Sequence, residues 1–357
     1  MPNPSDVNPL LQEMYNNRWY TNFGPLNARF EAEMVEFLAE SGSPGLSVGT
    51  FSSATTGLEL ILRAMRLPEG GKVLVPALTF PATALAVINA GLVPVLGDVD
   101  PYSWELTPEI AMYAHEKQDY VAVIPVAAFG KPVPTAGWQT FQRDTGIPVV
   151  LDTAAVLGQQ QVPTDLTAVF SLHATKPFGV GEGGLVATSD VALLERAQSL
   201  SNFGFLGTAG VVQQIGTNAK FGEYYAAVGL TQIQRWPEVI ERRRKVADVY
   251  LDKLSQFGNS IRLQAGVEGF VPAVLPIFAK GKGAEIFAAM TDNGIQTRHW
   301  YLPLLHKHPA LDGVDVVNAD GLMACDELGA GLVGLPFHSF LTCDDIDKIC
   351  AVLAEVV

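Results

Sequence analysis

The chain has 357 residues, of which 48% are apolar and 17% charged, so it is long enough for two compact domains and too apolar to be disordered. Its net charge of −14, with no basic stripe to offset it, argues against a nucleic-acid partner and against an acidic membrane surface. No apolar run reaches the roughly 18 uncharged residues of a membrane span, and the first residues lack the features of a secretory signal. We therefore expect a soluble, cytoplasmic protein.

Three cysteines, Cys325, Cys343 and Cys350, lie near the end of the chain. Their number is odd, and their spacing matches no zinc or redox motif. We expect reduced thiols in a cytoplasmic compartment and no metal site.

The stretch from about residue 26 to 235 alternates helix-like and strand-like patterns. Apolar residues at helical spacing predict helices over 27–39 and 55–65, and Ser52 or Ser53 can cap the second of these. Continuous apolar runs between helices are typical of strands in a parallel sheet that is buried on both faces. The runs are Lys72–Pro76, Val93–Leu96, Tyr120–Val126, Pro148–Leu151 and Ala168–Leu172.

The C-terminal part opens with a predicted amphipathic helix over 241–257, continues with mixed strand and helix patterns, and ends in a helix over 344–356. We therefore predict an α/β fold with two domains. Residues 1–240 form an N-terminal arm and a large domain, whose mostly parallel sheet is covered by helices. Residues 241–357 form a smaller α+β domain.

Ligands of open parallel sheets collect at the carboxyl ends of the strands. The segments that follow the apolar runs, 76–80, 127–130, 152–155 and 171–176, are therefore the first places to look for a binding site.

Lys176 follows a predicted buried strand and precedes a glycine-rich turn over 179–184. A lysine that forms a Schiff base must be partly neutral, and burial at a strand end favours the neutral amine. The alternative is a lysine in a surface loop. The glycine-rich turn is similar to a nucleotide-binding loop but lacks the Lys-Ser/Thr pair of a P-loop, so it does not predict a nucleotide site.

Asp152 ends another apolar run, so its carboxylate is expected at the rim of the sheet. A buried carboxylate needs a cationic or hydrogen-bonded partner. A protonated pyridine nitrogen is one such partner, and a protonated ring is an electron sink. The alternative is an aspartate that caps a helix.

Residues 53–58 begin a predicted helix, whose first free amides are a place for an anion. Ala54 and Thr55 are small enough to let a phosphate approach, and Thr55 and Ser171 add hydroxyl donors. The alternative is plain capping by Ser52 or Ser53. Phe80, at a further strand end, either stacks on a flat ring or packs in the core.

Together these motifs resemble the sugar aminotransferases of the DegT/StrS type, within pyridoxal-phosphate (PLP) fold type I. The resemblance covers nearly the whole chain, in matching order and spacing. Its segments are Trp19–Gly24, Ser53–Leu58, Val75–Phe80, Val95–Pro101, Asp152–Ala154, Phe170–Lys176, Gly181–Gly184, Asn202–Gly204, Gly216–Lys220, Ala226–Gly229, Gly294–Arg298, Trp300–Tyr301 and Leu335–His338.

The resemblance implies an aspartate-aminotransferase-like fold, PLP as the cofactor and a role for each matching position. Lys176 would form the Schiff base and move the proton, and Asp152 would pair with the pyridine nitrogen. The phosphate would be held by Ala54, Thr55 and Ser171, with Phe80 against the ring. Asn218 would reach the cofactor of a partner subunit in a homodimer. Substrate contacts would come from Lys220, Arg298 and Tyr301.

Two departures from the family pattern concern the cofactor site. Ala155 stands where the family usually has Gln or His, and Ala127 replaces a common His. A non-catalytic, PLP-binding sensor therefore remains an alternative. A PLP-dependent sugar dehydratase is disfavoured because those enzymes replace the lysine that this chain keeps at Lys176. A nicotinamide-dependent oxidoreductase is disfavoured because no Gly-x-Gly-x-x-Gly follows the first strand.

The reaction that the resemblance implies is a ping-pong transamination. An amino donor, L-glutamate, would leave its amino group on the cofactor, and a keto sugar linked to a nucleotide would then take it up. The sugar and the nucleotide do not follow from the sequence.

Overall fold

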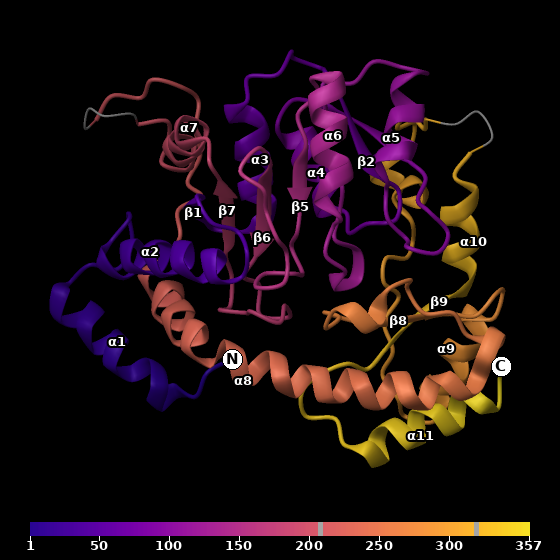
Figure 1. Cartoon of the computed structure of the whole chain (residues 1–357). Helices are drawn as coiled ribbons and strands as arrows, with labels where there is room; N and C mark the ends of the chain where they lie inside the picture. The colour runs from indigo at the N-terminus through magenta and orange to yellow at the C-terminus, as the bar shows by residue number, and fades with distance from the viewer. Residues whose placement is uncertain (206–209, 318–320) are drawn as a thin grey trace.

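The computed structural model describes residues 1–205, 210–317 and 321–357, and shows a sheet with helices on both faces beside a smaller unit (Figure 1). The strands of the sheet are β1 (Ser47–Phe51), β2 (Lys72–Pro76), β3 (Val93–Gly97), β4 (Ala122–Val123), β5 (Val150–Asp152), β6 (Thr167–Ser171) and β7 (Gly184–Thr188). Its helices are α1 (Pro4–Asn17), α2 (Pro25–Glu40), α3 (Ala54–Ala64), α4 (Ala82–Asn89), α5 (Pro108–His115), α6 (Thr135–Thr145) and α7 (Val191–Ser201).

The strands form two paired groups, β1-β7-β6-β5 and β3-β2-β4. Parallel bridges from Val123 to Val149 and from Val126 to Asp152 join the groups at β4 and β5. β7 runs antiparallel to both of its neighbours, and the other pairs are parallel. The prediction of a mostly parallel sheet is confirmed.

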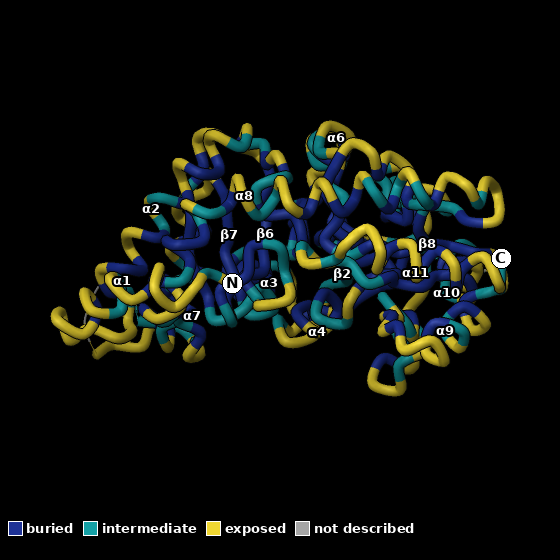
Figure 2. Tube along the Cα trace, turned by 90° about the horizontal axis from the view of Figure 1, so that it is seen from below, coloured by how far each residue is buried: buried dark blue, intermediate teal, exposed yellow. Residues whose placement is uncertain are grey.

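Both faces of the sheet are buried, because alternate residues of a strand point to opposite sides. Val73 and Val75 of β2 join the apolar cluster of α3, α4 and α7, whereas Leu74 between them joins the cluster of α1, α2, α5 and α6. Figure 2 shows β6 and β7 buried between helices with exposed outer faces. The continuous apolar runs of the sequence arise from this double burial.

The two predicted N-terminal helices and the predicted strand positions are confirmed, with shorter strands at two places. The run 120–126 pairs as a strand at Ala122–Val123 and then turns into a 3-10 helix, η1 (Ala128–Gly130). The sequence pattern does not predict β1 or β7. β7 begins at Gly184, the last residue of the glycine-rich turn, so the glycines that predict a turn hide the start of the strand.

Helix α8 (Glu223–Leu254) is a single long helix that runs from the sheet to the smaller unit (Figure 1). The predicted start at residue 241 is wrong. Pro237 lies inside α8, and a proline there usually marks a helix end. Buried residues before and after it, Trp236 and Tyr250, hold the two halves against their neighbours. The predicted domain limit between 240 and 241 falls within this helix, and it stays a prediction.

The smaller unit contains α9 (Gly283–Asp292), α10 (Met323–Gly331), α11 (Cys343–Ala354) and the antiparallel pair β8 (Leu275–Phe278) and β9 (Leu332–Leu335). Its core includes Tyr250 of α8 and Ile349 of α11. Leu304 and Leu305 pack instead into the cluster beneath α3 and α4, so the segment after residue 300 returns to the edge of the large sheet.

In the described ranges, no helix is both long and apolar enough to cross a membrane. The same residues contain no group of three or more His, Cys, Asp or Glu that is arranged to hold a metal ion.

Candidate active site

A cavity of about 330 Å³ opens at the carboxyl ends of β1, β2, β4, β5 and β6. Two segments of the later chain, at Ala273–Val274 and Trp300–Tyr301, also line it. Most of the predicted site residues line it, namely Ala54, Thr55, Phe80, Asp152, Ser171, Lys176 and Tyr301. The structure therefore brings together residues that are far apart in the sequence.

Asp152 is the last residue of β5, and its carboxylate is buried at the floor of the cavity. The Thr83 hydroxyl donates a hydrogen bond of 2.7 Å to Oδ2, and the Ala154 amide donates one of 3.2 Å to Oδ1. Burial raises the pKa of Asp152, whereas these two hydrogen bonds and the Lys176 amine act in the opposite direction. Asp152 is thus held as an acceptor in an apolar setting.

Lys176 lies in a tight turn after β6. Its amide donates to the His173 carbonyl at 2.9 Å, and the Ala174 amide donates to the Gly181 carbonyl at 2.8 Å, so the glycine-rich segment closes this turn. Burial lowers the pKa of Lys176, and Asp152 acts against this effect. A lysine amine whose neutral form is favoured is a nucleophile at moderate pH.

The N-terminus of α3 faces the cavity beside Ser171. Ser53 caps this helix: its hydroxyl accepts from the Thr56 amide at 3.1 Å, and its own amide donates to the Thr56 hydroxyl at 3.1 Å. The first two amides, of Ala54 and Thr55, have no acceptor among the described residues. Free amides at a helix N-terminus suit a phosphate.

Aromatic side chains form one wall of the cavity. Tyr301 stacks on Phe129, with ring centroids 4.9 Å apart and an interplanar angle of 16°. Phe80 meets Tyr301 edge to face at 6.5 Å and is 54% exposed in the single chain, which leaves its ring available for a flat ligand. Burial raises the pKa of Tyr301 to about 12, so the phenol is neutral.

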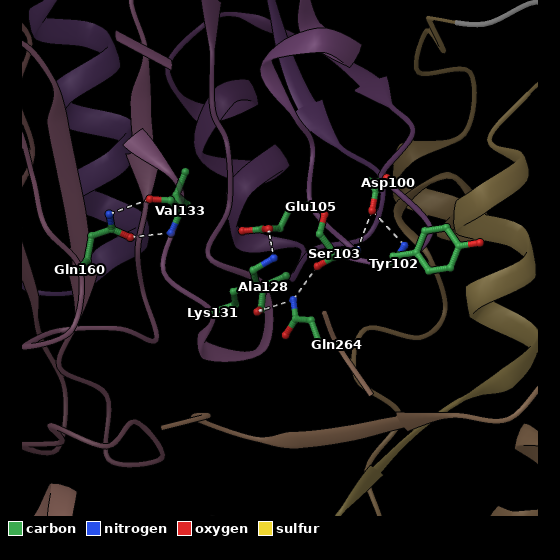
Figure 3. A network of polar contacts seen from close by, with 9 residues as sticks. All are labelled: Asp100, Tyr102, Ser103, Glu105, Ala128, Lys131, Val133, Gln160 and Gln264. Carbon is green, nitrogen blue, oxygen red and sulfur yellow. Dashed lines mark hydrogen bonds and ion pairs between the residues drawn. The ribbon is translucent and has the colours of Figure 1, made fainter. Parts of the chain in front are cut away.

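A largely buried polar network lies next to η1 (Figure 3). The Lys131 ammonium and the Glu105 carboxylate are 2.6 Å apart, and little of either side chain is exposed. The Gln264 amide donates to the Ser103 carbonyl at 2.8 Å and to the Ala128 carbonyl at 3.4 Å. This network connects the segment after β3 with η1 and with the segment before β8.

Asn218, Lys220 and Arg298 do not line the cavity in the described part of this single chain. The Lys220 ammonium donates to the Asn218 side-chain oxygen at 2.7 Å and lies 4.5 Å from the Phe203 ring centroid. Arg298 is exposed, and its backbone pairs with Gly334. Their predicted roles stay predictions.

Sequence reasoning missed two buried hydroxyls, Thr79 and Thr83. Thr79 lines the cavity, and its oxygen is 3.1 Å from that of Thr83. Thr79 lies in the segment after β2 that the strand-end rule selected, but Thr83 lies one helical turn further, on α4. The strand-end rule selects only the residues directly after a strand, so it misses a site residue such as Thr83 on the helix that follows.

The residues present fit PLP. The cavity offers one amine at Lys176, one buried carboxylate at Asp152 and free helical amides, which match an aldehyde, a ring nitrogen and a phosphate. Ala127 and Ala155 line the same cavity with methyl groups, so these two positions supply no side-chain hydrogen bond.

Comparisons with known proteins agree over the full length. The sequence profile of the DegT/DnrJ/EryC1/StrS aminotransferase family matches residues 4–354. The chain is 29% identical to Protein Rv3402c of Mycobacterium tuberculosis, covering 99% of this chain and 88% of that protein. It is 26% identical to the dTDP-4-amino-4,6-dideoxy-D-glucose transaminase of Shigella dysenteriae, covering 100% and 97% of the two chains. The crystal structure of DesI with its TDP-sugar product superposes with a TM-score of 0.87 at 27% identity, covering 99% and 90%.

Proposed function

Because the chain belongs to the DegT/DnrJ/EryC1/StrS aminotransferase family, we propose that it moves an amino group from L-glutamate to a nucleotide-linked keto sugar. Membership makes it a PLP-dependent aminotransferase. The sugar-nucleotide part of the proposal is supported by relatives whose names carry a dTDP-linked or TDP-linked sugar.

When bound, the cofactor supplies an electrophilic aldehyde carbon and an electron-withdrawing ring, which make the carbon beside an amino group acidic. Lys176 provides the amine that reacts with this aldehyde. With its amine free, Lys176 would be the base that takes a proton from the substrate carbon at Nζ and the acid that would deliver it to the former aldehyde carbon of the cofactor. The pKa of Lys176, lowered by burial, suits both steps.

Asp152 would keep a proton on the ring nitrogen through its carboxylate. The carboxylate must be ionised for this, and the donors at Thr83 and Ala154 favour that state against the cost of burial. Ala54, Thr55 and Ser171 would hold the phosphate, and Phe80 would lie against the ring. These contacts would keep the reacting carbon beside Lys176 and exclude water from it.

The chain acts as a homodimer in this proposal, and Asn218 reaches the phosphate of the partner's cofactor. Support comes from the position of Asn218, which is exposed at the protein surface and whose side chain is held by Lys220. Lys176 is the one lysine or arginine among the described residues that line the cavity, so Lys220 and Arg298 are proposed to meet the anionic groups of the substrates.

The observation that carries the proposal is the meeting of Lys176 and Asp152 at one cavity, where each shifts the pKa of the other. The test has two measurements. PLP bound covalently to wild-type protein gives a visible absorbance band that Lys176→Ala must lose and that Lys220→Ala must keep. Turnover is followed as 2-oxoglutarate released from L-glutamate in the presence of keto sugars.

The proposal is supported if Lys176→Ala loses the band and the wild-type protein releases 2-oxoglutarate in the presence of a keto sugar. An unchanged band in Lys176→Ala contradicts it. Cofactor binding without 2-oxoglutarate for any keto sugar identifies a PLP-binding sensor instead.

A further inference from the structure

Two buried threonines connect the cavity to Asp152. Thr83 is on the first turn of α4 and is 1% exposed, and Thr79, four residues earlier, is also 1% exposed. The distance from Thr79 Oγ1 to Thr83 Oγ1 is 3.1 Å, and that from Thr83 Oγ1 to Asp152 Oδ2 is 2.7 Å. The three side chains form an unbroken chain of hydrogen bonds.

The direction of this chain follows from the number of protons. An ionised carboxylate only accepts, so the single hydroxyl proton of Thr83 must go to Asp152. The Thr83 oxygen then accepts the proton of Thr79. Each donor strengthens the next bond, and a donor to an anion gives a stronger bond than a neutral pair does. The ordered chain therefore stabilises the ionised form of Asp152.

The same contacts set the orientation of the carboxylate. In the described structure Asp152 has two hydrogen-bond donors, the Ala154 amide on Oδ1 and the Thr83 hydroxyl on Oδ2. One contact on each oxygen fixes the plane of the group. Thr83 suits this task because a β-branched side chain in a helix has few accessible rotamers.

We propose that Thr83 is a positioning residue for the ring-nitrogen contact: it keeps Asp152 ionised and oriented, and Thr79 orients the Thr83 hydroxyl. This inference rests on the proposed function, because it takes PLP as the ligand of the cavity. Thr83 acts through Asp152, so its effect depends on a nitrogen in the ring of the ligand.

The test compares two ligands and three variants by equilibrium binding. The ligands are PLP and 1-deaza-PLP, which has carbon in place of the ring nitrogen. Thr83→Val removes the hydroxyl and keeps the shape, Thr83→Ser keeps the hydroxyl, and Thr79→Val removes the second hydroxyl. We expect Thr83→Val to bind PLP about ten- to a hundredfold more weakly, as the loss of a charge-assisted hydrogen bond implies.

The same variant must bind 1-deaza-PLP within about threefold of wild type, because no nitrogen contact is left to lose. Thr83→Ser must keep PLP affinity within about threefold, and Thr79→Val must give an intermediate loss. Equal weakening of both ligands in Thr83→Val shows a packing role and overturns the inference, as does unchanged PLP affinity. Wild-type protein that binds neither ligand contradicts the proposed function itself.

Discussion

Gly184, the first residue of β7, lies directly against the N-cap of α3: a Cβ atom at this position would come within 2.3 Å of the carbonyl carbon and oxygen of Ser53. Gly184 also pairs with Phe51 of β1 and Ser171 of β6. The pairing of β7 with β1 and β6 thus fixes the position of the α3 N-terminus, and of its free amides, relative to the sheet. A side chain at Gly184 would have to move either the strand or the helix.

We expect Gly184→Ala to lower the affinity for PLP more than tenfold and the free energy of unfolding by about 1–3 kcal/mol, because the backbone atoms of Ser53 must shift. Fluorescence titration and urea unfolding measure the two effects. Gly269→Ala is the matched control, since a Cβ there meets nothing within 4 Å. Wild-type affinity in Gly184→Ala would show that the phosphate does not depend on this contact.

The Glu105–Lys131 pair predicts a dependence of stability on pH. Burial raises the pKa of Glu105 to about 7 from an ordinary value of 4.5. Between these values the folded chain keeps a proton that the unfolded chain has lost, so the free energy of unfolding falls as pH rises through this window. The total loss is about 3 kcal/mol, and the titration of Glu105 adds no further pH dependence above about pH 7.

Urea unfolding at about pH 5 and about pH 8 measures this loss. Glu105→Gln has no carboxyl group to titrate at this position. Between the two pH values, its free energy of unfolding must therefore fall by about 2–3 kcal/mol less than that of the wild-type protein. The variant also removes the carboxylate partner of Lys131, so the two proteins are compared by their pH dependence and not by their absolute stability. Parallel profiles for the two proteins would contradict the pKa shift.

Arg243 of α8 is hydrogen-bonded to the segment 272–273, and Ala273 of this segment lines the cavity. The buried guanidinium of Arg243 donates to the Pro272 carbonyl at 2.9 Å and to the Ala273 carbonyl at 2.7 Å. Arg243→Met leaves both carbonyls without this donor, so we expect the free energy of unfolding to fall by about 2–4 kcal/mol and KM for the proposed sugar acceptor to rise. Arg242→Met is the control, because Arg242 is exposed and pairs with Glu238 on the surface.

Asp98 ties the end of β3 to α10. Its carboxylate accepts from the Ala324 amide at 2.9 Å and from the Cys325 amide at 2.8 Å, at the N-terminus of that helix. We expect Asp98→Ala to lower the free energy of unfolding by about 1–3 kcal/mol, measured by urea unfolding, because two helix-end amides lose their acceptor. Asp312→Ala, at an exposed position, must stay within about 0.5 kcal/mol of wild type.

Much of the cavity was predictable because strand ends in a parallel sheet meet at one edge. Asp152, Lys176 and Phe80 each follow an apolar run, and the run alone places them at that edge. No sequence pattern predicts the role of Thr83. A threonine in an apolar helix is expected to pack in the core, and its partner Asp152 is remote in sequence. Contacts of this kind depend on how two elements are placed in space.

The C-terminal part of the chain was less predictable. Tyr301 was expected to contact substrate, but its stacking on Phe129 depends on a segment that returns to the large sheet after β8 and α9. The start of α8 was missed because Pro237 reads as a helix end. In both cases tertiary packing overrides a local signal.

The continuity of α8 makes the geometry of the catalytic chamber sensitive to insertions far from it. One extra residue near Pro237 would turn everything downstream by about 100° and advance it by about 1.5 Å. Ala273 and Tyr301, which line the chamber together with Lys176, both lie downstream. Chimaeric enzymes that join two parent sequences inside this helix must therefore keep its residue count unchanged, whereas joints in exposed loops can differ in length.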